Sequence, residues 1–99
     1  PDLYAHDGDP VGKQAFIERI DHAFAPLLEQ PIAIAVCADH STPCSTGRHS
    51  GDPVPAILSS PGGRRDGCEH YGESDCMRGG LGRISASGLI GSLLDQMNV

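Results

Sequence analysis

Five side chains of this sequence belong to the types that bind divalent metal ions, and they fall in three short segments. They are Asp2, His6, Asp39, His40 and His49. Carboxylate oxygens and imidazole nitrogens together suit ions such as Mn²⁺, Zn²⁺ or Co²⁺. Ligands divided three and two between a pair of ions would leave open positions for a phosphate or an activated nucleophile. The set therefore predicts a two-metal site for phosphate chemistry.

The spacing of these residues supports a shared site. Asp2 and His6 are four residues apart, so on a turn or a helix start both side chains can point at one ion. Asp39 and His40 are adjacent, and they converge only if they lie in a loop, because neighbours on a regular strand point to opposite faces. His49 can return to the first ion. A single Asp-His pair is most often a solvated turn, so the prediction depends on all three segments together.

The cysteines offer a competing interpretation, a small structural zinc module without enzymatic activity. Two sets have suitable residue types: Cys37, His40, Cys44 and His49, and then Cys68, His70 and Cys76. Neither set has the short Cys-x₂₋₄-Cys spacing that is typical of such sites. Cys37 also falls in a predicted buried strand, where a free cysteine acts as a small hydrophobic side chain. These features favour the carboxylate and histidine site.

Other polar residues have an ordinary structural explanation. Ser41, Thr42 and Ser45 follow the Asp-His pair and are interpreted as turn residues rather than as nucleophiles. The segment 79–82 is rich in glycine but lacks the Lys-Ser/Thr ending of a phosphate-binding loop.

Two helices and two strands are expected to position the site. Asp9 and Pro10 form a cap and a first helical residue, followed by an amphipathic stripe that ends near Pro26. The stripe consists of Phe16, Ile17, Ile20, Phe24 and Leu27. The elements expected after it are a strand over 32–37, a second strand over 54–59, a long loop over 60–82 and a helix over 87–97. The run 32–37 is apolar without alternation, which predicts a strand buried on both faces of a parallel sheet. We therefore expect an α/β fold with Asp39 and His40 beyond the carboxyl end of a strand.

Composition limits the classes of function. The chain has 99 residues, suited to one small domain, and its formal net charge of −6 argues against a nucleic-acid partner. No apolar stretch is long enough to cross a membrane, and no signal peptide is recognisable. We therefore expect reduced cysteines and a cytoplasmic protein with no membrane partner.

The order of the motifs resembles the carboxy-terminal part of archaeal-type cofactor-independent phosphoglycerate mutases, in the alkaline phosphatase superfamily. Asp2-Leu-Tyr-Ala-His6-Asp-Gly8 is similar to the family's Asp-x-x-x-His-x-Gly segment. Ala38-Asp39-His40-Ser-Thr-Pro43 resembles its Ala-Asp-His element, and His49-Ser-Gly-Asp-Pro-Val-Pro55 its late histidine segment. Residues 73–84 resemble the segment before the last helix.

This resemblance implies a fold, an activity and a set of ligands. The fold would be a partial three-layer sandwich with a mostly parallel sheet, in which residues 1–99 form the carboxy-terminal part of the metal-binding domain. Asp2, His6 and His49 would hold one ion, and Asp39 and His40 the other, with Mn²⁺ expected and Zn²⁺, Co²⁺ or Mg²⁺ as alternatives. The whole protein would interconvert 3-phosphoglycerate and 2-phosphoglycerate.

The resemblance also implies that part of the machinery lies elsewhere. The nucleophilic serine, an early aspartate and the substrate-binding domain would precede Pro1, so this chain alone is expected to be inactive and to have that missing part as its partner. No catalytic residue is therefore assigned within the chain. A homoserine-kinase-like enzyme, or another phosphotransferase of the superfamily, is the closest alternative because it would share these ligands.

Overall fold

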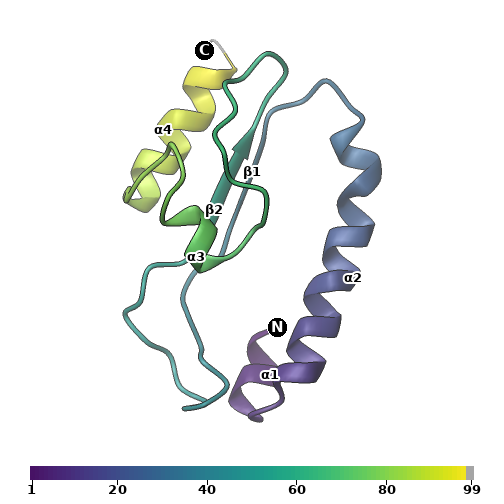
Figure 1. The fold of residues 1–99 in the computed structure, drawn as a ribbon, viewed down its shortest axis with the longest axis vertical. Coiled ribbons are helices and arrows are strands. Elements are labelled where there is room, and N and C mark those ends of the chain that lie inside the picture. The colour runs from purple at the N-terminus through teal and green to yellow at the C-terminus, as the bar shows by residue number, and fades with distance from the viewer. Residues whose placement is uncertain (98–99) are drawn as a thin grey trace. The chain divides into compact units, whose positions relative to one another are not determined.

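A computed structural model describes residues 1–97 of the chain (Figure 1). Its elements are α1 (Asp2–His6), α2 (Pro10–Leu28), β1 (Ile34–Cys37), β2 (Ala56–Ser59), α3 (Glu73–Cys76) and α4 (Ala86–Gln96). The chain divides into two compact units. The helical unit comprises residues 1–30 and 40–52, and the sheet unit comprises residues 31–39 and the chain from residue 53 onward.

The helical unit is built on α2, which begins where the sequence predicts. The Asp9 carboxylate accepts a hydrogen bond of 2.9 Å from the backbone N–H of Gly12, and Pro10 occupies the first turn. This cap satisfies one of the N–H groups that a helix start leaves without a partner. α1 packs beside this start, where the Tyr4 and Phe16 rings lie 5.8 Å apart between centroids. The short α1 is thereby held against α2.

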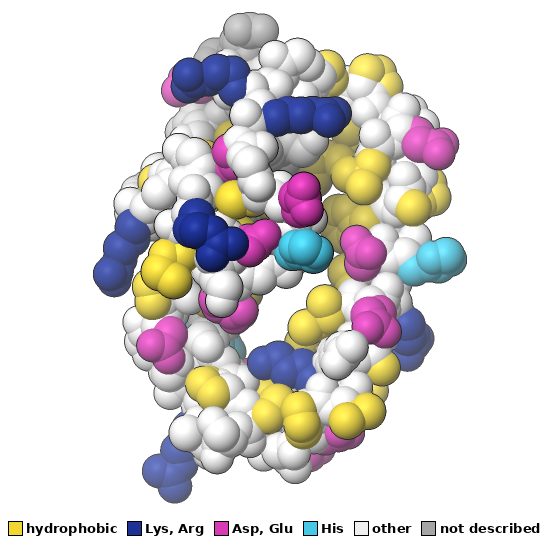
Figure 2. Space-filling view, viewed as in Figure 1, with side chains coloured by type: hydrophobic (Ala, Val, Ile, Leu, Met, Phe, Trp, Pro, Cys, Tyr) yellow, Lys and Arg dark blue, Asp and Glu magenta, His cyan; other side chains and the backbone are white. Residues whose placement is uncertain are grey.

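The apolar stripe of α2 is present but is not covered within the described chain. No residue of α2 is buried. Ile17, Ile20 and Leu27 keep 41%, 38% and 44% of their surface exposed. Figure 2 shows hydrophobic side chains open to solvent on the visible face of the molecule. The stripe therefore lacks the packing partner that its periodicity anticipates.

The sheet unit corrects the predicted strand pairing. β1 and β2 are antiparallel, with Ile34 opposite Ser59 and Cys37 opposite Ala56, so the predicted parallel arrangement is wrong for this pair. A parallel pair needs a long crossover connection, usually a helix, and the connection over 38–55 contains no helix. An apolar run does not by itself distinguish the two directions.

The strand ends and their burial also differ from expectation. β2 starts at Ala56 rather than at residue 54, because Pro55 has no N–H to donate to a ladder. Cys37, predicted to be buried, is exposed, since β1 is paired along one edge in a two-stranded sheet rather than buried within a larger one. α4 confirms the predicted last helix, with Leu89 as its buried residue.

The segment predicted as a plain loop over 60–82 contains the short helix α3 and is organised by two carboxylates. Asp66 accepts hydrogen bonds from the backbone N–H groups of Cys68 and Gly80, at 3.0 and 2.7 Å. Asp75 accepts from the N–H groups of residues 69 and 70 and pairs with Arg78. The bond from Gly80, followed by that from Cys68, lowers the pKa of Asp66. Backbone donors thus replace the apolar core that the glycine-rich segment lacks.

None of the described helices combines the length and the apolar character that crossing a membrane requires.

The cap of α2 provides a test of the helical unit. We expect Asp9→Ala to lower the free energy of unfolding by about 1 kcal/mol, because the Gly12 N–H loses its acceptor. Urea denaturation of the full-length protein measures the change. Asp21→Ala, an exposed position in the same helix, is the matched control and should have a smaller effect. Equal losses in the two variants would contradict the capping role.

The Asp66 hydrogen bonds predict a pH-dependent stability. Because folding lowers the pKa of Asp66, its carboxylate stabilises the fold above the unfolded pKa of about 3.9, and this contribution is lost as the pH falls through the folded value. The difference in urea midpoint between the wild type and Asp66→Asn should therefore be largest near neutral pH and shrink toward pH 3. Asp95→Asn in α4 is the control. A difference that stays constant over this range would contradict the prediction.

Candidate metal centre

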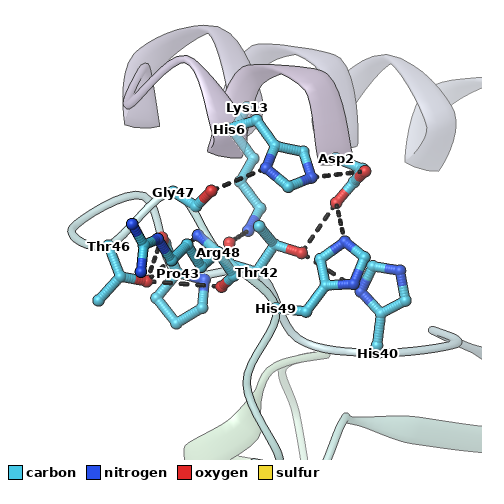
Figure 3. A network of polar contacts seen from close by, with 10 residues as sticks. All are labelled: Asp2, His6, Lys13, His40, Thr42, Pro43, Thr46, Gly47, Arg48 and His49. Atoms are coloured by element: carbon cyan, nitrogen blue, oxygen red, sulfur yellow. Dashed lines mark hydrogen bonds and ion pairs between the residues drawn. The ribbon is translucent and has the colours of Figure 1, made fainter.

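The helix α1 brings the first two predicted ligands together. Asp2 and His6 lie one turn apart, and the Oδ2 atom of Asp2 is 3.2 Å from Nε2 of His6 (Figure 3). Both side chains are partly exposed, at 49% and 39%. The four-residue spacing therefore places a carboxylate and an imidazole face to face, as the sequence predicts.

The second nitrogen of His6 is fixed by the loop that follows residue 43. Nδ1 of His6 lies 2.7 Å from the carbonyl oxygen of Gly47. A carbonyl only accepts, so Nδ1 carries the proton of this bond. Gly47 has a φ of 62°, and a Cβ there would meet the backbone oxygen of His6 at 3.0 Å. Glycine is thus required for the close approach that orients His6.

The two later histidines are aligned by a short bridge between their segments. The N–H of Ser50 donates to the carbonyl of Ser41 at 2.9 Å, in an isolated antiparallel bridge. His40 and His49 each precede one of these serines, and their rings stack with centroids 3.7 Å apart. Nε2 of His49 lies 3.8 Å from Oδ1 of Asp2. The bridge therefore places the imidazoles of His40 and His49 near the Asp2 carboxylate of α1.

A threonine not expected at the site joins these groups. Thr42 keeps only 4% of its surface exposed. Its hydroxyl donates to Oδ1 of Asp2 at 2.8 Å and contacts Nδ1 of His40 at 3.2 Å. The ammonium of Lys13 in α2 donates to the Thr42 carbonyl at 3.0 Å. The turn signal in the sequence accounts for the backbone here but carries no information about the partners of the hydroxyl.

These contacts favour the ionised form of Asp2. The hydrogen bond from Thr42 is the main cause that lowers the pKa of this carboxyl group, and desolvation opposes it. The nearby His6, His40 and His49 add smaller effects in the same lowering direction. An ionised carboxylate is the form that binds a metal ion.

Four of the five predicted ligands gather in the helical unit. Asp2, His40 and His49 each offer one ligand atom, and these three atoms lie within 4.8 Å of one another. His6 contacts the other oxygen of the same carboxylate. His40 thus lies beside His49, although the family resemblance implies that the two bind different ions. The role of Asp39, and the division of the ligands between two ions, stay predictions.

The donor set fits a divalent cation. With Nδ1 protonated, a neutral His6 presents the lone pair of Nε2 to Oδ2 of Asp2, so two acceptors face each other at 3.2 Å. Ligands of one tetrahedral ion with bonds of about 2.0–2.1 Å are separated by roughly 3.3 Å. A cation between the two atoms, whether a proton or a metal ion, would relieve their repulsion.

The competing zinc site built on cysteines lacks this convergence. Within the described residues, the group of three potential ligands contains no cysteine. Cys68 instead donates its thiol to the Asp75 carbonyl at 3.1 Å, and burial raises the pKa of this thiol. The described geometry therefore favours the carboxylate and histidine group over a cysteine site.

Comparison with known proteins assigns a family to this arrangement of residues. The family model of the Metalloenzyme superfamily matches residues 1–96. The chain is 48% identical over 95 residues to a protein of Methanocorpusculum labreanum, covering 95% of this chain and 23% of that relative. It is 42% identical over 101 residues to a protein of Thermococcus kodakarensis, covering 98% and 25%. Both relatives are named 2,3-bisphosphoglycerate-independent phosphoglycerate mutase.

A solved structure agrees with the fold. A protein of Pyrococcus horikoshii superposes on the chain with a TM-score of 0.91 at 40% identity. The match covers 98% of this chain and 26% of that structure. The chain therefore spans about a quarter of the length of the curated relatives and of the solved structure that it matches.

Removal of the shared carboxylate tests the centre directly. We expect Asp2→Asn to weaken Mn²⁺ or Zn²⁺ binding by more than about 100-fold, beyond the range for residues that only support a ligand. Competition with a chromophoric chelator in the full-length protein measures the affinity. Asp7→Asn, at an exposed position just after α1, is the matched control and should bind as the wild type does. A loss with Cys44→Ser but not with Asp2→Asn would overturn the assignment in favour of a cysteine site.

Proposed function

Since the chain belongs to the Metalloenzyme superfamily, we propose that it supplies metal-binding segments to a 2,3-bisphosphoglycerate-independent phosphoglycerate mutase. The whole enzyme would interconvert 3-phosphoglycerate and 2-phosphoglycerate. The observation that carries this proposal is the convergence of Asp2, His40 and His49, together with the contact between Asp2 and His6. The names of relatives 42–48% identical to the chain support this choice of reaction.

The ligands are proposed residue by residue. Asp2, His6 and His49 would hold one divalent ion, and Asp39 and His40 would contribute to a second, with Mn²⁺ as the expected metal. When bound, such ions neutralise charge on a transferring phosphoryl group and lower the pKa of a nucleophile. The mixed carboxylate and imidazole donors support this class of ion.

This chain's own task is to orient and present the ligands. The Gly47 carbonyl holds the proton on Nδ1 of His6, which leaves Nε2 directed at Asp2. The bridge between Ser41 and Ser50 sets the spacing of the two stacked imidazoles. Fixed orientation before substrate arrives reduces the reorganisation that the reaction requires.

The nucleophile and the groups that bind the glycerate are proposed to lie in the remaining three quarters of the enzyme. Ser50, a serine near the centre, supports this division, since its hydroxyl donates to Asp52 at 2.7 Å. Residues 1–99 would form the carboxy-terminal part of the metal-binding domain. The chain alone would therefore be inactive.

The remaining part of the same protein is proposed as the partner that covers the exposed apolar surface. Ile17, Ile20 and Leu27 of α2 form an uncovered stripe, and each strand of the two-stranded sheet has one edge without a partner strand in the described chain. Burial of apolar surface stabilises by about 25 cal/mol per Å², and an unpaired edge can extend a sheet. Both features suit a larger sandwich.

The proposal predicts a metal-dependent mutase activity. We expect the full-length protein with Mn²⁺ to convert 3-phosphoglycerate to 2-phosphoglycerate without added 2,3-bisphosphoglycerate. His49→Gln should reduce kcat/KM by about 100-fold or more, as expected when about 3 kcal/mol of charge stabilisation is lost. His22→Gln, an exposed position on α2, is the control and should retain activity.

The assay also distinguishes the alternative phosphotransferase. A folded protein that binds divalent ions but does not convert 3-phosphoglycerate would overturn the mutase proposal. Phosphorylation of homoserine by ATP in that same preparation would identify the kinase-like relative instead.

A further inference from the structure

We propose that Thr42 is a positioning residue of the metal centre, whose hydroxyl fixes His40 in the Nδ1-protonated tautomer and so makes Nε2 its metal-binding nitrogen. This inference rests on the proposed metal-binding function of Asp2 and His40. It concerns a residue whose position in the sequence indicates only a turn.

The burial of Thr42 is the first observation. It is the buried polar residue among the described positions, with 4% of its surface exposed. A buried hydroxyl requires hydrogen-bond partners, and Thr42 finds both of them among the proposed ligands. Its oxygen lies 2.8 Å from Oδ1 of Asp2 and 3.2 Å from Nδ1 of His40.

Counting protons assigns a direction to each bond. A threonine hydroxyl has one hydrogen to donate and lone pairs to accept with. The ionised carboxylate of Asp2 only accepts, so it receives that hydrogen in the shorter contact. The remaining contact is then a bond in which Nδ1 of His40 donates and the Thr42 oxygen accepts.

The protonation of Nδ1 determines which atom of His40 can bind an ion. A neutral imidazole has one N–H and one lone pair, so Nε2 carries the lone pair. His6 follows the same rule through a different acceptor, since its Nδ1 donates to the Gly47 carbonyl. Two histidines of the centre thus have their Nδ1 proton held by groups that are not ligands, an arrangement that orients metal-binding imidazoles in general.

Lys13 fixes the position of Thr42 itself. Its ammonium donates to the Thr42 carbonyl at 3.0 Å and ties this residue to α2. Lys13 thereby anchors the backbone of Thr42, while the Thr42 hydroxyl contacts Asp2 and His40. The threonine links the helix to two proposed ligands that lie 40 and 2 residues away in sequence.

Thr46 provides the contrast within the same loop. Its hydroxyl contacts the carbonyls of Pro43 and Arg48, at 3.3 and 3.5 Å, and accepts from the N–H of Arg48. These are the local backbone bonds of an ordinary turn residue. The Thr42 hydroxyl instead contacts side chains of the centre, those of Asp2 and His40. The same substitution at the two positions therefore separates a positioning role from a structural one.

The first measurement is metal affinity in the full-length protein, with Mn²⁺ and Zn²⁺ as probes. We expect Thr42→Val, which keeps the shape but removes the hydroxyl, to weaken binding by about 10–100-fold. Thr42→Ser restores the hydroxyl and should return the affinity to within a few-fold of the wild type. Thr46→Val should bind as the wild type does. Equal affinities for Thr42→Val and Thr46→Val would overturn the proposal.

The second measurement reads the tautomer in the metal-free protein. Histidine ring ¹⁵N shifts near pH 8, where an ordinary imidazole is neutral, report which nitrogen is protonated, and His40→Gln assigns the signals. We expect the Nδ1–H form of His40 in the wild type and in Thr42→Ser, and its loss in Thr42→Val. A wild-type His40 in the Nε2–H form would overturn the proposal even if a variant fails to fold.

The two measurements also separate this inference from the function on which it rests. Wild-type protein that binds neither ion would refute the metal centre itself, whatever the tautomer. Wild-type protein that binds an ion while His40 has its proton on Nε2 would refute only the role of Thr42.

Discussion

The candidate site depends on the carboxylate of Asp2, because every other group of the centre is placed relative to it. One oxygen faces His6, and the other faces the Thr42 hydroxyl and His49. These partners come from α1 and from the segment 40–52, which are distant in sequence. Three imidazoles lie near this one ionised carboxylate. A carboxylate and imidazoles together form a donor set that attracts and binds a divalent cation.

The loop between Ser41 and Ser50 positions the three histidines around this carboxylate. The bridge between the two serines stacks His40 on His49, and the left-handed backbone of Gly47 lets a carbonyl reach His6. Backbone hydrogen bonds of this loop therefore orient His6 and align His40 with His49. Backbone hydrogen bonds also organise the sheet unit, where the Asp66 carboxylate accepts from the N–H groups of Cys68 and Gly80.

The described chain buries few apolar residues, which agrees with the importance of polar contacts in both units. Ala5 and Leu89 are the buried hydrophobic residues among the described positions. An amphipathic helix gains most of its stability from the surface that its apolar face packs against, and none of residues 1–97 buries the apolar face of α2. The chain spans about a quarter of the length of its matched relatives, and the remainder of the larger enzyme is the packing partner proposed above.

The sequence by itself determined most of the local elements and the candidate ligands. The cap at Asp9 and the apolar periodicity predict α2, and residue type with spacing marks Asp2, His6, His40 and His49. These are properties of neighbouring residues, which helix geometry and ligand chemistry translate directly into structure. The tertiary structure alone decided the antiparallel pairing of β1 with β2, the stacking of His40 on His49 and the part played by Thr42. Each of these depends on contacts between residues that are not adjacent in the chain, and neither periodicity nor turn chemistry encodes such contacts.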